Sequence, residues 1–209
     1  MAWANSGALL RLVAMSLSLV FVSSGSVALA QKSYGPGVSD TEITIGQTMP
    51  YSGPVSAAGT IGRAEVAYFR MINAHGGIHG RKITLISLDD GYSPPKTLEQ
   101  VRRLVEQENV LAVFNIVGTP TSAAVQPYLN AHKVPQLFIQ SGASRFADPE
   151  HYPWTISIFS SYRAEARVYA QYALATMPDA KVAVLYQNKI LARTTSKDSK
   201  RAWVTGRLR

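Results

Sequence analysis

The chain has 209 residues, a net charge of +8 and no cysteine. Its length suits one or two domains, and the lack of cysteine excludes disulfides and thiolate metal sites. The charge does not indicate a basic binding face, because residues 189–209 carry seven basic side chains and only one acid. The rest of the chain is close to neutral.

The first residues have the pattern of a secretory signal. Arg11 precedes an apolar run from Leu12 to Val22, and small residues follow up to Ala30. This order predicts a signal peptide at 1–30, cleavage before Gln31 and a periplasmic location. An uncleaved membrane anchor is the alternative, but the apolar run is shorter than the ~20 residues that a span requires.

The mature chain alternates predicted strands and helices. Apolar and β-branched runs predict strands at 41–49, 81–90, 110–118, within 135–144, and at 180–188. Helical spacing of apolar residues predicts helices at 63–75, 93–107, 119–133 and 162–177. Ser93 is expected to cap the second helix, and Pro127 to disturb the middle of the third. The order predicts an α/β fold, with a parallel sheet covered by helices on both faces.

Small and hydroxyl residues follow three of the predicted strands. They are Ser52 and Gly53 after the first strand, Gly118, Thr119, Pro120 and Thr121 after the third, and Ser141, Gly142, Ala143 and Ser144 after the fourth. Parallel sheets bind ligands beyond the carboxyl ends of their strands, and free amides at helix N-termini suit a carboxylate. Each loop alone is better explained by capping and tight turning. Their convergence on one edge favours a ligand site.

The sequence shows no recognisable catalytic motif. It lacks a G-x-S-x-G elbow, a P-loop and a G-x-G-x-x-G run after the first strand. His75 and His79 straddle two glycines, which disfavours a shared metal site. Asp89 and Asp90 could form an acid pair, but a solvated pair at a helix start is favoured. Neither an enzyme nor a metal or other cofactor is predicted.

Four segments carry a family resemblance: ITIGQTMPYSGP, YFRMINAHGGIHGRKITLISLDDGYSPPKTLEQVRRLVEQ, GTPTSAAVQPYLNAHKVPQLF and PDAKVAVLYQN. In this order they resemble the branched-chain amino acid (Leu/Ile/Val) type of periplasmic substrate-binding protein, which serves an ABC transporter. The resemblance implies a type I periplasmic-binding-protein fold, in which two α/β lobes close on a small ligand. Here it implies a first lobe at 31–158 and the start of a second, incomplete lobe at 159–188. It also implies a permease partner in the membrane and a monomer when full length.

The resemblance assigns the ligand carboxylate to the loops from Gly118 to Thr121 and from Ser141 to Ala143. Tyr162 opens the first helix of the second lobe, where it either faces the cleft or packs on the surface. Amino-acid-binding members usually have a hydroxyl at the position of Ala143 and an aromatic residue near Ala58. Their absence leaves an amino acid and another small carboxylate, aromatic or aliphatic, both open as the ligand.

Residues 189–209 depart from the family pattern, which continues after Asn188 with Gly-Lys-Asp-Tyr and a helix. One permitted set of codons from Lys189 onward, read two bases later, encodes Asp-Leu-Gly-Lys-Asp-Tyr and then an amphipathic helix. We therefore predict a frameshift close to Asn188, and a truncated copy with impaired binding.

An exported protein whose basic tail contacts nucleic acid or an anionic membrane is the alternative. Trp203 lies among the basic residues and would help stacking. Against it, the tail has no apolar period, and export removes most nucleic-acid partners. No nucleic-acid partner is therefore predicted. A secreted sensor domain with the same lobes is a third class that the sequence leaves open.

Overall fold

The structure is a computed structural model that describes residues 32–179 and residue 181. The predicted signal peptide, nearly all of the predicted strand at 180–188 and the tail at 189–209 lie outside the described residues. The elements below belong to the unit that begins at Tyr34.

A parallel sheet forms the centre of this unit. Its strands are β1 (Glu42–Met49), β2 (Lys82–Asp89), β3 (Val113–Phe114), β4 (Gln136–Ile139) and β5 (Thr155–Ser157), in the order β2-β1-β3-β4-β5. β1 and β2 pair in parallel along their whole length, from Glu42 opposite Lys82 to Met49 opposite Asp89. The strand order reverses between β1 and β3, and open α/β sheets bind ligands at the carboxyl end of such a switch point.

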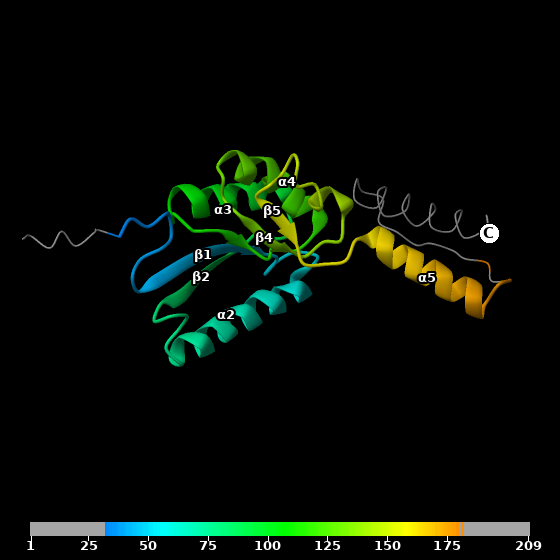
Figure 1. The fold of residues 1–209 in the computed structure, drawn as a ribbon, viewed down its shortest axis with the longest axis horizontal. Coiled ribbons are helices and arrows are strands. Elements are labelled where there is room, and N and C mark those ends of the chain that lie inside the picture. The colour runs from blue at the N-terminus through cyan, green and yellow to red at the C-terminus, as the bar shows by residue number, and fades with distance from the viewer. Residues whose placement is uncertain (1–31, 180, 182–209) are drawn as a thin grey trace, which may run out of the picture. The chain divides into compact units, whose positions relative to one another are not determined.

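Helices cover both faces of the sheet, as Figure 1 shows. The helices are α2 (Gly59–Ala74), α3 (Pro94–Glu106), α4 (Thr119–Ala131) and α5 (Tyr162–Thr176), with short 3₁₀ turns η1 (Ser56–Ala58) and η2 (Ser144–Phe146). α2 lies on one face, and α3 and α4 lie together on the other. The predicted α/β fold with helices on both faces is confirmed.

The main core lies between the sheet and helices α3 and α4. It consists of Val101, Leu104, Val110, Val113, Ile116, Val125 and Leu129, all almost fully buried. Gly46 of β1 lets α3 approach the sheet, because a Cβ there would lie only 2.9 Å from a methyl group of Leu104. Apolar residues at helical spacing on α3 therefore pack as their pattern predicts.

The α2 face of the sheet holds a polar group of side chains. Gln47 of β1 and Asn115, which follows β3, both donate hydrogen bonds to the carboxylate of Glu65 on α2. Burial raises the pKa of Glu65, while the two amide donors act in the opposite direction. Asn115 takes a φ of 54° in making this contact, and the residue ends the strand.

The predicted strand at 110–118 is therefore much shorter in the structure, where β3 is limited to Val113–Phe114. Pairing resumes only as an isolated bridge between Val117 and Gln140. β5 was not predicted, because a strand of three residues at the edge of a sheet shows too little alternation to be recognised.

Helix α2 begins at Gly59, earlier than the predicted start at Arg63. Two glycines in its first turn made the segment look like a loop, but both are buried. A Cβ at Gly62 would lie 2.4 Å from the hydroxyl oxygen of Tyr51. These glycines therefore let the helix pack closely against Tyr51.

The sequence predicted a cap for α3 at Ser93 and a disturbance of α4 at Pro127. Ser93 occupies the N-cap of α3, as predicted, but its side chain makes no capping hydrogen bond. Its carbonyl instead accepts from the amide and the hydroxyl of Thr97. Helix α4 continues through Pro127, so the predicted disturbance does not end it.

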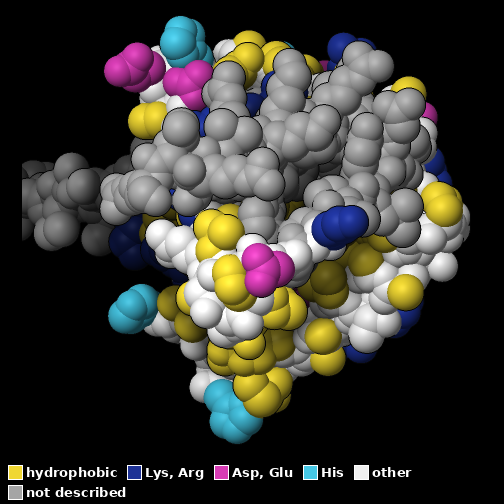
Figure 2. All heavy atoms as spheres, turned by 90° about the vertical axis from the view of Figure 1, so that its right-hand side faces the viewer, with side chains coloured by type: hydrophobic (Ala, Val, Ile, Leu, Met, Phe, Trp, Pro, Cys, Tyr) yellow, Lys and Arg dark blue, Asp and Glu magenta, His cyan; other side chains and the backbone are white. Residues whose placement is uncertain are grey.

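Several large apolar side chains remain exposed. They include Tyr68 and Met71 on α2, Phe138 on β4, Ile156 on β5, and Val168, Tyr169 and Tyr172 on α5. Figure 2 shows hydrophobic side chains, in yellow, on the face that it draws. Among the described residues, no helix combines the length and the apolar character that a membrane crossing requires.

Candidate ligand site at the carboxyl edge

Two of the predicted loops meet at the carboxyl edge beside β3 and β4. The hydroxyls of Thr119, at the start of α4, and Ser141, just after β4, are hydrogen-bonded to each other. Ser141 also accepts a hydrogen bond from the amide of Ala143 at 3.2 Å. Both hydroxyls are nearly buried. Residues 22 positions apart in sequence thus form one small polar group, as convergence on one edge predicts.

Thr121, in the first turn of α4, stabilises the loop that leads into this helix. Its hydroxyl donates to the carbonyls of Val117 and Gly118, and its side chain is fully buried. The bonds hold the turn between β3 and α4, which is the capping and turning role considered for these loops. Its role as a ligand residue stays a prediction.

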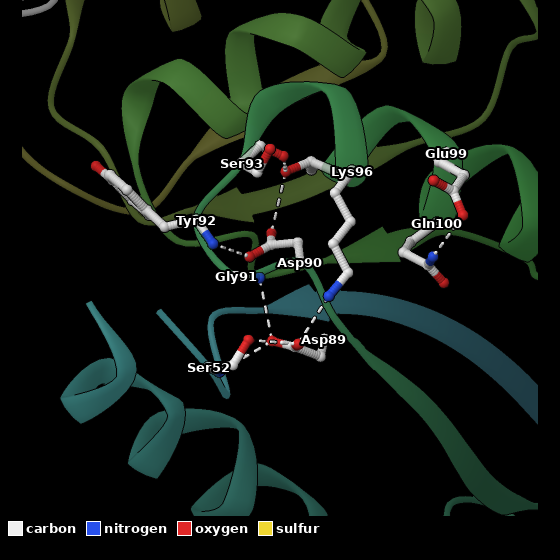
Figure 3. Close-up of polar contacts among 10 residues, drawn as sticks. Ser52, Asp89, Asp90, Gly91, Tyr92, Ser93, Lys96, Glu99 and Gln100 are labelled. Carbon is white, nitrogen blue, oxygen red and sulfur yellow. Dashed lines mark hydrogen bonds and ion pairs between the residues drawn. The ribbon is translucent and has the colours of Figure 1, made fainter. Parts of the chain in front are cut away.

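Ser52 lies on the neighbouring loop, after β1, and is bound to Asp89. Its amide and hydroxyl donate to the two oxygens of the Asp89 carboxylate at 3.0 and 2.6 Å. Lys96 of α3 donates to the same carboxylate at 2.8 Å, as Figure 3 shows. Ser52 therefore ties the loop after β1 to the loop after β2, and none of its described hydrogen bonds reaches the other predicted site residues.

Asp89 and Asp90 have opposite environments. Partial burial opposes ionisation of Asp89, but donors from Lys96, Ser52 and Gly91 outweigh it and hold the pKa of Asp89 well below its usual range. Asp90 is fully buried. Burial raises the pKa of Asp90 despite hydrogen bonds from the Tyr92 amide and the Thr97 hydroxyl. The favoured interpretation of a solvated pair is therefore wrong for Asp90, whose carboxylate organises the turn that carries Tyr92.

Tyr92 is a residue of this edge that sequence reasoning missed. Its backbone has a φ of 60°, and its side chain leaves the Asp90 turn and points away from Lys96 (Figure 3). The ring lies against Gly118, where a Cβ would be 2.5 Å from Cε2 and 2.7 Å from the hydroxyl oxygen. The only sequence signal was an aromatic residue among small residues and prolines in a loop at a strand end.

Tyr162, at the start of α5, occupies an equivalent place against Gly142. A Cβ at Gly142 would lie 2.8 Å from Cδ1 of Tyr162. The Tyr162 amide donates to the Gly142 carbonyl at 2.8 Å, and its ring packs on the cluster of Ile139, Ala143 and Phe146. The structure thus brings together Gly118, Thr119, Ser141, Gly142, Ala143 and Tyr162, and adds Tyr92.

This arrangement provides hydrogen-bond donors and aromatic surface. The first-turn amides of Thr119 and Thr121 have no acceptor within the described part of the chain. Such amides favour an anion through hydrogen bonding and the helix dipole. One hydroxyl of the nearby Thr119–Ser141 pair keeps a free O–H and can donate as well. Chemically, the edge is suited to hold a small carboxylate, and the described residues hold no cluster of three or more potential metal ligands.

Substituting Asp89 by asparagine should lower the free energy of unfolding at neutral pH by about 1 kcal/mol, because it weakens hydrogen bonds to a charged acceptor. The lowered pKa means that the folded state releases this proton more readily than the unfolded chain. The stabilisation is therefore complete above about pH 4 and is lost as the pH falls towards the folded pKa. Urea denaturation at pH 7 and pH 3 should show the difference between the two proteins shrinking at the lower pH. An equal difference at both values would contradict this.

Known proteins share both sequence and fold with the chain. The sequence pattern of the family described as periplasmic binding protein matches residues 42–207. This range includes most of the tail, whose predicted frameshift stays a prediction. The Leu/Ile/Val-binding protein homolog 7 of Brucella abortus (strain 2308) is 27% identical over 188 residues.

Two solved structures are similar to the chain. A possible leucine/isoleucine/valine-binding protein from Rhodopirellula baltica SH 1 is 27% identical, with a TM-score of 0.72 over 79% of this chain and 45% of that one. A solute-binding protein from Rhodopseudomonas palustris BisB5, solved with 3,4-dihydroxybenzoic acid, has a TM-score of 0.68 over 79% of this chain and 44% of its own. At 21% identity it supports the fold alone.

The chain spans less than half the length of these proteins, because the match covers 82% of the chain and 44% of the Brucella protein. The names of these relatives describe binding proteins, and none of them describes an enzyme. The family match and the shared parallel fold agree, and the chain belongs to the periplasmic binding protein family.

Proposed function

We propose that the chain is part of an exported solute-binding protein that captures a small carboxylate or amino acid and delivers it to an ABC transporter permease. The observation that carries this proposal is the hydroxyl pair of Thr119 and Ser141 beside the first turn of α4. It places a hydroxyl donor beside the first-turn amides at the carboxyl edge, next to the switch point where sheets of this order bind ligands.

Export is part of the proposal, with removal of residues 1–30 by signal peptidase. The support is the basic residue, apolar run and Ala28-Leu29-Ala30 order in the sequence. The mature chain would then meet its solute and its permease in the periplasm, where the family acts.

We also propose that the chain on its own binds solute weakly. Ligand pockets gain affinity by enclosing most of the ligand surface, and the described residues supply one wall of a site. A carboxylate on that wall stays in contact with water, which competes for its hydrogen bonds and leaves a net contribution of only about 1 kcal/mol each. Dissociation constants in the millimolar range are therefore expected.

The test is a titration of the chain with small carboxylates, followed by ligand NMR signals, which detect millimolar binding. Saturable binding of a carboxylate, absent for the matching amide, would support the proposal. Ser141→Ala should weaken that binding about tenfold, the effect of one lost hydrogen bond to a charged group. Ser39→Ala is the matched control, because Ser39 precedes the amino end of β1, at the opposite edge of the sheet. Failure of every carboxylate to bind, or equal binding by Ser141→Ala, would contradict the proposal.

A further inference from the structure

Tyr92 connects two parts of the carboxyl edge that are separate in sequence. It comes from the loop after β2, and its ring reaches the turn after β3, on the other side of β1 in the sheet. Its position is fixed by the hydrogen bond from its amide to the buried carboxylate of Asp90 at 2.8 Å. The ring therefore lies across the switch point of the sheet.

At this edge, two tyrosine rings pack against two glycines. Gly118 has a φ of +96° and a Cβ on it would meet Tyr92. Gly142 would meet Tyr162 and the Ser160 carbonyl. Burial raises the pKa of Tyr92, and the Tyr162 phenol acts in the same direction. The two rings thus pack on the two loops that the Thr119–Ser141 pair joins.

The Tyr92 hydroxyl is available to a ligand. Within the described part of the chain it makes no hydrogen bond, and it is not one of the buried polar atoms that lack a partner, so it is open to solvent. The side chain is only half-buried. The hydroxyl oxygen is among the ring atoms closest to Gly118, the N-cap of α4, next to the first-turn amides. It is a protonated donor at neutral pH, because a tyrosine hydroxyl has a pKa of about 10.

We infer that Tyr92 is a ligand-contacting, specificity-determining residue, whose hydroxyl donates to the ligand carboxylate and whose ring, with that of Tyr162, selects a flat aromatic or conjugated body. This inference rests on the proposed carboxylate site. Aromatic rings prefer offset or edge-to-face contacts with other rings, so the two phenols favour a planar ligand over a branched aliphatic one.

The acids beside Tyr92 agree with a simple carboxylate as the ligand. An amino acid would also bring an ammonium group, which needs an acceptor when it is removed from water. Asp89 is already engaged by Lys96 and Ser52, and Asp90 is fully buried beneath the turn. Neither carboxylate is available to such a group.

Four probes separate the two roles of Tyr92: benzoate, cyclohexanecarboxylate, benzamide and leucine. The chain should bind benzoate more tightly than cyclohexanecarboxylate, which has the same charge without the flat ring, and should bind benzamide and leucine more weakly still. Tyr92→Phe removes only the hydroxyl and should weaken both carboxylates about tenfold. Tyr92→Leu should also abolish the preference for benzoate.

Tyr128→Phe is the matched control, because the Tyr128 hydroxyl donates to Glu106 on the outer side of α3 and α4. This variant should bind the four probes as the unmodified chain does. Unfolding curves of each variant exclude a folding defect, and Tyr92→Phe keeps the test valid if Tyr92→Leu does not fold. Carboxylate binding that Ser141→Ala weakens but both Tyr92 variants leave unchanged would overturn this inference and preserve the proposed function. Equal binding of the flat and the non-flat carboxylate by the unmodified chain would also overturn it. Binding of no probe would overturn both.

Discussion

Replacing Leu104 by alanine is expected to lower the free energy of unfolding by about 2–5 kcal/mol, the range for large-to-small substitutions that leave a cavity. Leu104 is fully buried between α3 and the sheet. Its methyl groups lie over Gly46 of β1. Urea denaturation measures the loss, and Leu111→Ala, at a side chain that is 37% exposed, should cost far less.

A substitution at Gly46 tests the same contact from the side of the sheet. Apart from its two neighbours in sequence, the atoms nearest to a Cβ placed there are three atoms of Leu104, at 2.9 to 3.1 Å. Gly46→Ala alone should therefore overpack the core and cost about 1–3 kcal/mol. In the Leu104→Ala background the new methyl fills part of the cavity instead. The double variant should be clearly more stable than the sum of the two losses predicts, and strict additivity would show that the two residues do not share this space.

Replacing Gly118 by alanine is expected to reduce carboxylate binding at least tenfold and to destabilise the fold. Two causes add together at this position. The backbone, with a φ of 96° and a ψ of 153°, is in a region that only glycine enters readily, and such strain costs about 1–3 kcal/mol. The new methyl would also lie 2.5 Å from the Tyr92 ring, which must then leave its place over the start of α4.

Gly76→Ala separates the two causes, because Gly76 has a φ of 97° but no atom within 4 Å of a Cβ built there. It should lose stability through backbone strain and keep its carboxylate binding. Ligand NMR titration and urea denaturation of both variants provide the comparison. Full binding by Gly118→Ala would show that the Tyr92 ring and the N-cap of α4 are not part of the site.

The elements of this fold were largely predictable from local patterns. Strands β1 and β2 and helices α3, α4 and α5 lie within a few residues of their predicted bounds. The order of strands and helices also predicted a parallel sheet with two covered faces, because short connections allow few other arrangements. The loops after β3 and β4 were recognised as neighbours for the same reason, since parallel strands end on one edge.

The tertiary structure decided what depends on residues distant in sequence. β3 stops early at Asn115, which has a φ of 54° and whose side chain contacts Glu65 on α2, 50 positions away. α2 starts early because Gly62 packs on Tyr51. Tyr92 reaches the site only because buried Asp90 holds its turn and Gly118 leaves room for its ring. Periodicity and capping act within a few residues and are visible in the sequence. The place of a side chain in a ligand site depends on which loops the completed sheet brings together, and no local pattern encodes that.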